Sequence, residues 1–306
     1  DFLAWGPSRL TDARHWAQRR DPGPGPAPKD WKCNRLYCVE TMPSITGAMA
    51  DHRLATKPSG VPALLRSLAA KLGVNAGGKA ADKQEAWVDA LAKDLQGAAG
   101  KSLVLVGETQ PAEVHALAHA INQKLGNIGQ TVSFIEPVAH HGGPQGGTLA
   151  ELVKDIEDGS VDTLIMLGGN LVYEAPADLA VIKALDKVRN SVQFSIYEDE
   201  TTEHCRWHVP LAHTLESWGD IRAFDGSVTI QQPLIQPIYK SKSIVEVMKV
   251  LVEGTTTPDR VVVEEYWRAR GLGENFEAGW RKALHAGVVP GTASKPKTVT
   301  LKEGTF

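Results

Sequence analysis

Cysteine is scarce in this sequence: the 306 residues include three, Cys33, Cys38 and Cys205. An odd count of three does not make a disulfide framework of the kind that holds small secreted domains together. Three thiols are also too few for an iron–sulfur cluster, which is usually bound by four cysteine thiolates at short spacings. We therefore expect neither a disulfide scaffold nor an iron–sulfur cluster in this chain.

Long hydrophobic runs and a one-sided charge are also missing. The apolar stretches are only a few residues long, as at 103–106, whereas a membrane-spanning helix needs about 20 residues. The 33 Lys and Arg are scattered among 36 Asp and Glu, which gives a formal net charge of -3. Because no basic stripe with interleaved aromatic residues is present, the sequence predicts no nucleic-acid partner and no membrane span.

Three common motifs are absent as well: the G-x-G-x-x-G dinucleotide turn, the G-x-x-x-x-G-K-[ST] phosphate loop and the G-x-S-x-G nucleophile elbow. No nucleophile, base and orienting group assemble in the sequence, so we predict no catalytic residues. The chain begins at Asp1 without Met or a leader. We expect a processed protein or a piece of a longer one, and the missing leader says nothing about its compartment.

What the sequence does have is an alternation of strand and helix patterns from about 35 to 200. Apolar runs predict strands at 35–40, 102–107, 131–136, 161–167 and 191–197. Helical patterns fall at 8–20, 61–72, 82–95, 114–125, 148–158 and 177–189, where Thr148 and Glu151 form a T-x-x-E capping box. Short strands and turns follow at 207–239, and further helices at about 243–253, 259–270 and 274–285.

The predicted strands are continuous apolar runs more than strict alternations. This pattern is typical of a parallel sheet whose two faces are both covered by helices. We therefore expect an α/β, Rossmann-like fold with a mostly parallel sheet, a short β-rich segment and C-terminal helices. We place the α/β domain at 1–255 and a helical extension and linker at 256–306.

In an open parallel sheet, ligands bind at the carboxyl ends of the strands. Four predicted strand ends carry small or polar residues, at 40–44, 107–110, 168–170 and 198–202. Gly and Asn allow a close backbone approach, and the helices that follow favour anions at their N-termini. These turns could cradle a phosphorylated cofactor. Alternatively, they are only the tight turns that every parallel α/β domain needs.

Other candidate sites are weaker. The segment 140–147, HHGGPQGG, lacks the Lys and Ser/Thr of a phosphate loop, so we interpret it as a connection. His115 and His119 have zinc-like spacing on a helix, but they lie off its apolar stripe and we expect them on an exposed face. His204, Cys205, His208 and His213 could form a zinc site, although Cys205 would point away from His204 and His208 on a strand. We predict no metal ligands.

Three stretches together resemble the molybdopterin oxidoreductase superfamily. They are NRLYCVETMPSITGAMADHRL (34–54), GTLAELVKDIEDGSVDTLIMLGGNLVYEAPADL (147–179) and HVPLAHTLESWGDIRAFDGSVTIQQPLIQPIY (208–239). Within it, they are most similar to the large iron–sulfur, molybdopterin-oxidoreductase-like subunit of alternative complex III and polysulfide reductase-like respiratory complexes. The resemblance covers about residues 1 to 255, and Glu216, Gly219, Asp225 and Gly226 hold the places of a recurrent family stretch.

The resemblance implies a cofactor cleft. In molybdenum members of the superfamily, such strand ends bind molybdopterin guanine dinucleotide. The matching residues here are Gly107, Glu108, Thr109, Gly168, Gly169, Asn170, Asp199, Glu200 and Thr201. The N-terminal cysteine motif, the metal-ligating Ser or Cys and the second α/β domain of those members have no counterpart in this sequence. The corresponding half of alternative complex III is thought to keep the fold without molybdenum.

The resemblance therefore implies a cofactor-free domain of an electron-transfer subunit, with a vestigial cleft and iron–sulfur clusters in a part that lies downstream. Its expected partners are other subunits of a membrane-bound respiratory complex, including an integral membrane quinol-oxidising subunit and cytochrome c subunits. The expected location is the periplasmic side of the bacterial inner membrane. The alternative is part of a catalytic molybdenum enzyme that binds the pterin cofactor at the strand ends.

Overall fold

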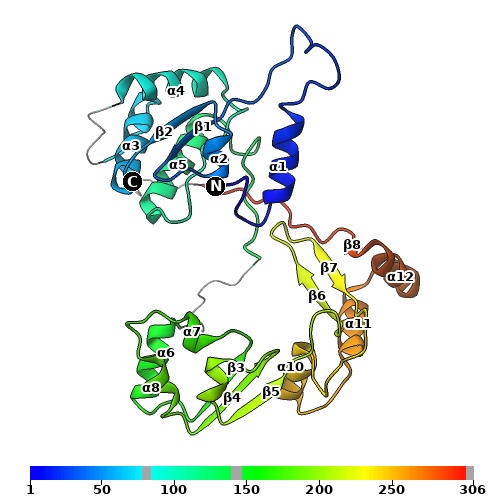
Figure 1. The fold of residues 1–306 in the computed structure, drawn as a ribbon. Helices are drawn as coiled ribbons and strands as arrows, with labels where there is room; N and C mark the ends of the chain where they lie inside the picture. Colours follow the sequence, from blue (N-terminus) through cyan, green and yellow to red (C-terminus); the bar gives the residue numbers. More distant parts are fainter. Residues whose placement is uncertain (78–83, 139–146, 301–306) are drawn as a thin grey trace. The chain divides into compact units, whose positions relative to one another are not determined.

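The computed structural model describes residues 1–77, 84–138 and 147–300 (Figure 1). It divides the chain into two compact units. Unit 1 is Asp1–Glu136 together with the segment from Lys295 onward, and unit 2 is Pro137–Ser294. The predicted boundary after residue 255 falls inside unit 2, between helices α10 (Ile244–Glu253) and α11 (Asp259–Arg270).

Unit 1 contains a small parallel sheet and a helical layer. Strand β1 (Tyr37–Glu40) pairs in parallel with β2 (His52–Ala55), and α2 (Ile45–Ala48) lies in the connection between them. The other elements are α1 (Arg9–Gln18), the 3₁₀ turn η1 (Pro58–Gly60), α3 (Val61–Lys71), α4 (Glu85–Gly97) and α5 (Ala112–Lys124). The buried leucines, valines and isoleucine of α3, α4 and α5 form one core cluster.

Two predicted strands of unit 1, 102–107 and 131–136, do not form a ladder. Residues 102–106 are extended: Val104 and Val106 pack on the core, and Leu103 and Leu105 are exposed. The fully buried amide of Asn122 takes the place of a neighbouring strand. Its Oδ1 accepts from Val104 N at 2.9 Å, and its Nδ2 donates to Val104 O at 2.7 Å. The segment 131–136 makes only isolated bridges, such as Phe134 with Lys297.

The first part of unit 2 is a three-stranded parallel sheet in the order β3-β4-β5. Its strands are β3 (Thr163–Leu167), β4 (Asn190–Ser195) and β5 (Trp207–Pro210). Helix α6 (Leu149–Glu157) begins with the predicted Thr148–Glu151 capping box, which is confirmed, and packs with α8 (Val181–Leu185) in one core cluster. The helix predicted at 177–189 is shorter because Ala180, at ψ 56°, leaves the helical region before Val181.

The second part of unit 2 is antiparallel. Strands β6 (Gly219–Arg222), β7 (Val228–Gln231) and β8 (Val288–Val289) pair in the order β6-β7-β8. Val228 and Ile230 of β7 pack with Trp267 of α11 and Trp280 of α12 (Phe276–Ala286) in a separate core cluster. The helices predicted at 243–253, 259–270 and 274–285 are confirmed with small shifts of their ends.

The fold class is thus confirmed as mixed α/β, but the large parallel sheet is not shown. The parallel strands of the described residues lie in one pair and one triplet. Periodicity identifies extended segments, but not which backbone groups each segment will bond. No helix of the described residues is both long and apolar enough to cross a bilayer.

Candidate functional site

The turn after β3 requires its glycines. Gly168 and Gly169 both have φ +76°, a backbone conformation that residues with a Cβ rarely adopt. Gly168 N still donates to Phe194 O of β4 at 2.7 Å. The chain then enters the short helix α7 (Leu171–Glu174), whose first turn is capped by the side chain of Asn170, an acceptor from Tyr173 N.

The end of β4 leads into a second capped turn. The Asp199 carboxylate accepts from the backbone N–H groups of Thr201 and Thr202 at the start of α9 (Glu200–Glu203). Gln193, which is fully buried, donates from Nε2 to Asp199 and to Gly169 O, and its Oε1 accepts from Thr202 at 2.7 Å. One buried amide therefore ties the turn after β3 to the turn after β4.

The two predicted groups of site residues also bond directly to each other. Thr201, which is fully buried, donates from Oγ1 to Asn170 Oδ1 at 2.9 Å and accepts from Val172 N at 3.0 Å. Asn170 Nδ2 donates to Glu200 at 2.5 Å, and this bond holds the pKa of the Glu200 carboxyl below its ordinary value. The structure thus brings 168–170 and 199–201 together, as the sequence predicts for neighbouring strand ends.

A hollow of about 300 Å³ lies at these strand ends. The described residues that line it are Gly168, Gly169, Asn170, Ser195, Ile196, Tyr197, Asp199 and Leu211. Among them the only charged side chain is a carboxylate, and none is Lys or Arg. Ile196 and Tyr197 are exposed at the hollow, so it combines apolar surface with a negative charge.

This arrangement does not fit the pyrophosphate of a guanine dinucleotide. An anion at a strand end is normally held by free N–H groups of a helix N-terminus or by Arg and Lys. Here Asn170 caps α7 and Asp199 caps α9, so the chain's own side chains occupy these donors. The carboxylates of Asp199 and Glu200 add repulsion, since like charges at short range are unfavourable.

Ser195 and His208 form a pair beside the hollow that could be taken for a nucleophile and its base. Ser195 Oγ lies 2.9 Å from His208 Nε2, and Glu198 lies 4.0 Å from His208 Nδ1. However, Ser195 Oγ also donates to Tyr197 O at 2.6 Å. A hydroxyl has one hydrogen, so His208 Nε2–H is the donor to Ser195. This polarity holds the turn in place and leaves Nε2 without the lone pair that a general base needs.

The third predicted group, Gly107, Glu108 and Thr109, belongs to unit 1. These residues form a turn between the extended segment 102–106 and α5, closed by Gln110 N donating to Gly107 O at 3.1 Å. The strand end at 40–44 is also in unit 1. There the Glu40 carboxylate accepts hydrogen bonds from Ser44 and pairs with Arg53 of β2. These neighbouring residues of unit 1 therefore already bond the carboxylate.

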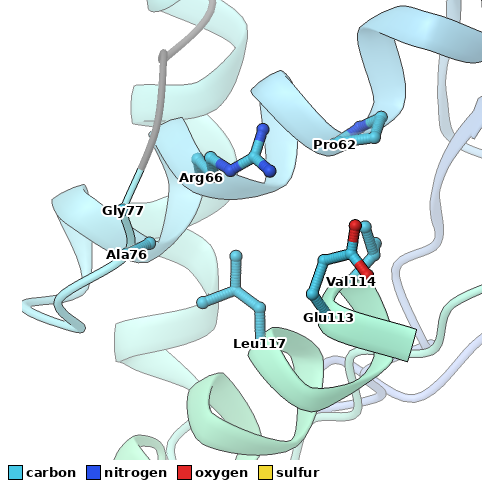
Figure 2. A pocket seen from close by; sticks show the side chains of 7 residues that line it. All are labelled: Pro62, Arg66, Ala76, Gly77, Glu113, Val114 and Leu117. Carbon is cyan, nitrogen blue, oxygen red and sulfur yellow. The ribbon is translucent and has the colours of Figure 1, made fainter. Parts of the chain in front are cut away.

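A second, smaller hollow lies in unit 1, between α3 and α5 (Figure 2). Its volume is about 20 Å³, which suits roughly one water molecule. Arg66 and Glu113 project toward it from the two helices, and Leu117 forms its apolar floor (Figure 2). The hollow is too small for a cofactor.

The candidate metal ligands are not gathered into a site. Among the described residues, no group of three or more His, Cys, Asp and Glu could hold a metal ion. His204 pairs with Asp186 at 3.1 Å, whereas His208 bonds Ser195. His115 and His119 are half-buried instead of exposed, and the His119 ring packs against Phe134, with 5.3 Å between the ring centroids. Burial lowers the pKa of His119. Most of the segment 140–147 lies outside the described residues.

Sequence reasoning missed the residues that hold the strand ends together. Ser191, Gln193 and Ser195 are buried at alternate positions of β4, and each accepts or donates a side-chain hydrogen bond. The sequence does contain a signal for these residues. Polar residues at every second position of an otherwise apolar run place a polar row on one face of the sheet.

In comparisons with known proteins, no family model matched the chain and no curated protein matched it.

Proposed function

We propose that this chain is a cofactor-free scaffolding domain of a respiratory electron-transfer subunit, of the quinol-oxidising alternative complex III type. The proposal starts from the resemblance of residues 34–54, 147–179 and 208–239 to that subunit. The observation that carries it is the self-bonded strand-end cluster of unit 2. Asn170, Asp199 and Thr201 satisfy one another and the helix N-termini, where a phosphorylated cofactor would need free donors.

In this role the domain performs no chemistry by itself. It holds the part of the subunit that carries the iron–sulfur clusters against the other subunits, among them an integral membrane quinol-oxidising subunit and cytochrome c subunits. The location that goes with this role is the periplasmic face of the inner membrane. The Gly168–Gly169 turn is then inherited architecture that closes the sheet end.

The alternative is a catalytic molybdenum domain that binds the pterin guanine dinucleotide at the strand ends. The hollow of about 300 Å³ between Gly168 and Asp199 is the observation in its favour. The carboxylate that lines this hollow and the capped N-termini of α7 and α9 argue against the catalytic alternative.

Elemental analysis of the natively purified complex for iron, molybdenum and tungsten separates the two, combined with an assay for oxidised pterin fluorescence. We expect iron without molybdenum or pterin. Stoichiometric molybdenum and pterin would overturn the scaffold role.

A variant pair sharpens this test. If the cleft binds a cofactor, Asn170→Ala lowers the molybdenum and pterin content of the complex, whereas the exposed Asn190→Ala leaves both unchanged. In the scaffold role, Asn170→Ala changes only the stability of unit 2, because Asn170 caps α7 and accepts from Thr201. Complex assembly, followed by co-purification of the partner subunits, then persists in both variants.

A further inference from the structure

We propose that His115 and His119 of α5 form a binding site for one exchangeable divalent transition-metal ion, Cu²⁺ in preference to Ni²⁺ or Zn²⁺. The pair belongs to unit 1, whereas the hollow at the strand ends belongs to unit 2. The inference does not depend on the proposed scaffold role. It rests on three features of the two histidines: their spacing on a packed helix, their unused nitrogens, and the contacts that hold the His119 ring.

The first feature is the spacing. Residues four apart on an α-helix lie on the same side, with about 5–6 Å between their Cβ atoms, so two imidazoles at this spacing can bind one ion. Helix α5 has 13 residues, and its opposite side buries Val114, Leu117 and Ile121 in the core of unit 1. The backbone that carries the two histidines is therefore held in place by packing before any ion binds.

The second feature is that both side chains still have nitrogens to offer. Neither imidazole has a hydrogen bond or an ion pair with any residue that the structure describes. In unit 2, by contrast, His204 bonds Asp186 and His208 bonds Ser195. A ring nitrogen binds a metal ion through a free lone pair. The pair on α5 therefore loses no internal hydrogen bond when it binds an ion.

The third feature is the setting of the His119 ring. The ring packs against Phe134, and its Nδ1 is buried without a hydrogen-bond partner, so Nε2 is the nitrogen that can reach an ion. Burial lowers the pKa of His119, and the charge of nearby His115 lowers it further. His119 is therefore neutral at neutral pH, which is the form that binds metal, and the two rings are close enough to interact.

The ligand set indicates the class of ion. No third His, Cys, Asp or Glu of the described residues joins the pair, so it does not make a closed structural zinc site, which has four protein ligands. Water fills the remaining positions, and such an ion exchanges. Imidazole nitrogens favour transition metals over Mg²⁺ and Ca²⁺, and among the divalent ions of the first row Cu²⁺ binds them most tightly. An ion that bridges one helical turn also stabilises α5.

Titration of the full chain with CuCl₂ in a non-chelating buffer at pH 7 tests the site, followed by calorimetry and electron paramagnetic resonance. We expect one equivalent of bound Cu²⁺ with two imidazole nitrogens in its spectrum. His115→Ala should weaken this binding by about tenfold or more, since one imidazole remains. His119→Gln should do the same while it keeps a side chain of similar size beside Phe134. Binding should also weaken at pH 5, because protons compete for the imidazoles.

The matched controls are His15→Ala and His285→Ala, because each removes one exposed histidine from another helix. A third control combines His140→Ala with His141→Ala, since these two histidines are neighbours in the sequence. All three should bind Cu²⁺ with unchanged affinity. The proposal is refuted if the chain binds no Cu²⁺, or if the two-nitrogen site survives in both His115→Ala and His119→Gln.

Discussion

Two segments of this molecule share one sequence pattern but differ in structure. Residues 102–106 and β3 are both apolar runs that end in a glycine turn before a helix. In unit 2 the run pairs with β4 and its turn bonds the next strand end. In unit 1 the run stays extended, and Asn122 bonds both polar groups of Val104. The comparison shows that a buried side-chain amide can make, on one side of an apolar run, the backbone hydrogen bonds that a neighbouring strand makes elsewhere.

Among the changes that test this comparison, we expect Asn122→Ala to have the largest effect on stability. The substitution leaves the N–H and C=O of Val104 without these partners in a partly buried setting, and it also removes one of the acceptors of Asn127 Nδ2. We expect a loss of roughly 2–4 kcal/mol in the stability of unit 1. Hydrogen exchange across α5 and 102–106 measures it. Gln123→Ala, on the exposed face of the same helix, is the control and should change the stability of unit 1 little. If Asn122→Ala also had only a small effect on that stability, the amide would not be essential.

The corresponding change in unit 2 is Thr201→Val, which keeps the shape and removes the hydroxyl. Thr201 is fully buried and bonds both Asn170 and Val172 N. The loss should be about 1–3 kcal/mol, since the partly buried N–H of Val172 loses its acceptor. Exchange rates of α7 and α9 report it, with the exposed Thr229→Val as the control. Unchanged exchange at α7 would show that the Thr201 hydroxyl is not needed to hold this helix.

A smaller effect concerns the loop between β1 and β2. Asp51 accepts from both terminal nitrogens of Arg20, at 3.0 and 2.8 Å, and this bond lowers the pKa of the Asp51 carboxyl from 3.8 to about 2. A depressed carboxyl pKa stabilises the fold above the ordinary value and loses that contribution as the pH falls from about 4 to 2. The contribution should be on the order of 1 kcal/mol, because the pair is partly solvated.

Acid titration of unit 1 stability checks this sign. Asp51→Asn should be less stable than the natural chain at pH 6 and should converge with it near pH 2. Asp30→Asn is the control, because its carboxylate is exposed. If the gap between Asp51→Asn and the natural chain instead widened toward pH 2, the pair would not be the cause.

The last prediction concerns the reactivity of the three thiols and involves no change in stability. Cys33 is exposed, whereas burial, with Glu40 nearby, raises the pKa of Cys38 to about 11. Burial also raises the pKa of Cys205. At pH 8 roughly one Cys38 in a thousand is a thiolate. A thiol-reactive chromogenic disulfide should therefore label one residue quickly and two slowly, and Cys33→Ser should abolish the fast phase. A fast phase that survives in Cys33→Ser would contradict the burial of the other two.

Local sequence signals predicted most elements of this fold. The capping box of α6, the strand runs of β3 and β4 and the three C-terminal helices all depend on neighbours within a few residues. The pairing of the strands was not predictable in the same way. Whether 102–106 meets a strand or an asparagine depends on Asn122 of α5, and no periodicity encodes that contact.

For the candidate site too, the position of the residues was predictable from the sequence, but their hydrogen bonds were not. That 168–170 and 199–201 meet follows from parallel order, which places successive strand ends at one edge. The hydrogen bonds between them depend on Gln193 of β4 and Thr201 of α9. The directions of these side chains are set only when β4 has paired with its neighbours and the turn after it has formed. The sequence therefore located the strand ends, but could not show that their donors are already occupied.

The bridge between Phe134 and Lys297 has a consequence for how the chain is made. Lys297 N bonds Phe134 O, and the Lys297 side chain pairs with Glu136, so the last described segment completes unit 1. All of unit 2 is translated between these two partners. The ribosome therefore releases unit 2 in full before unit 1 can gain its final contacts. Pulse-labelled nascent chains should show protease resistance arising in unit 2 before unit 1 is fully protected.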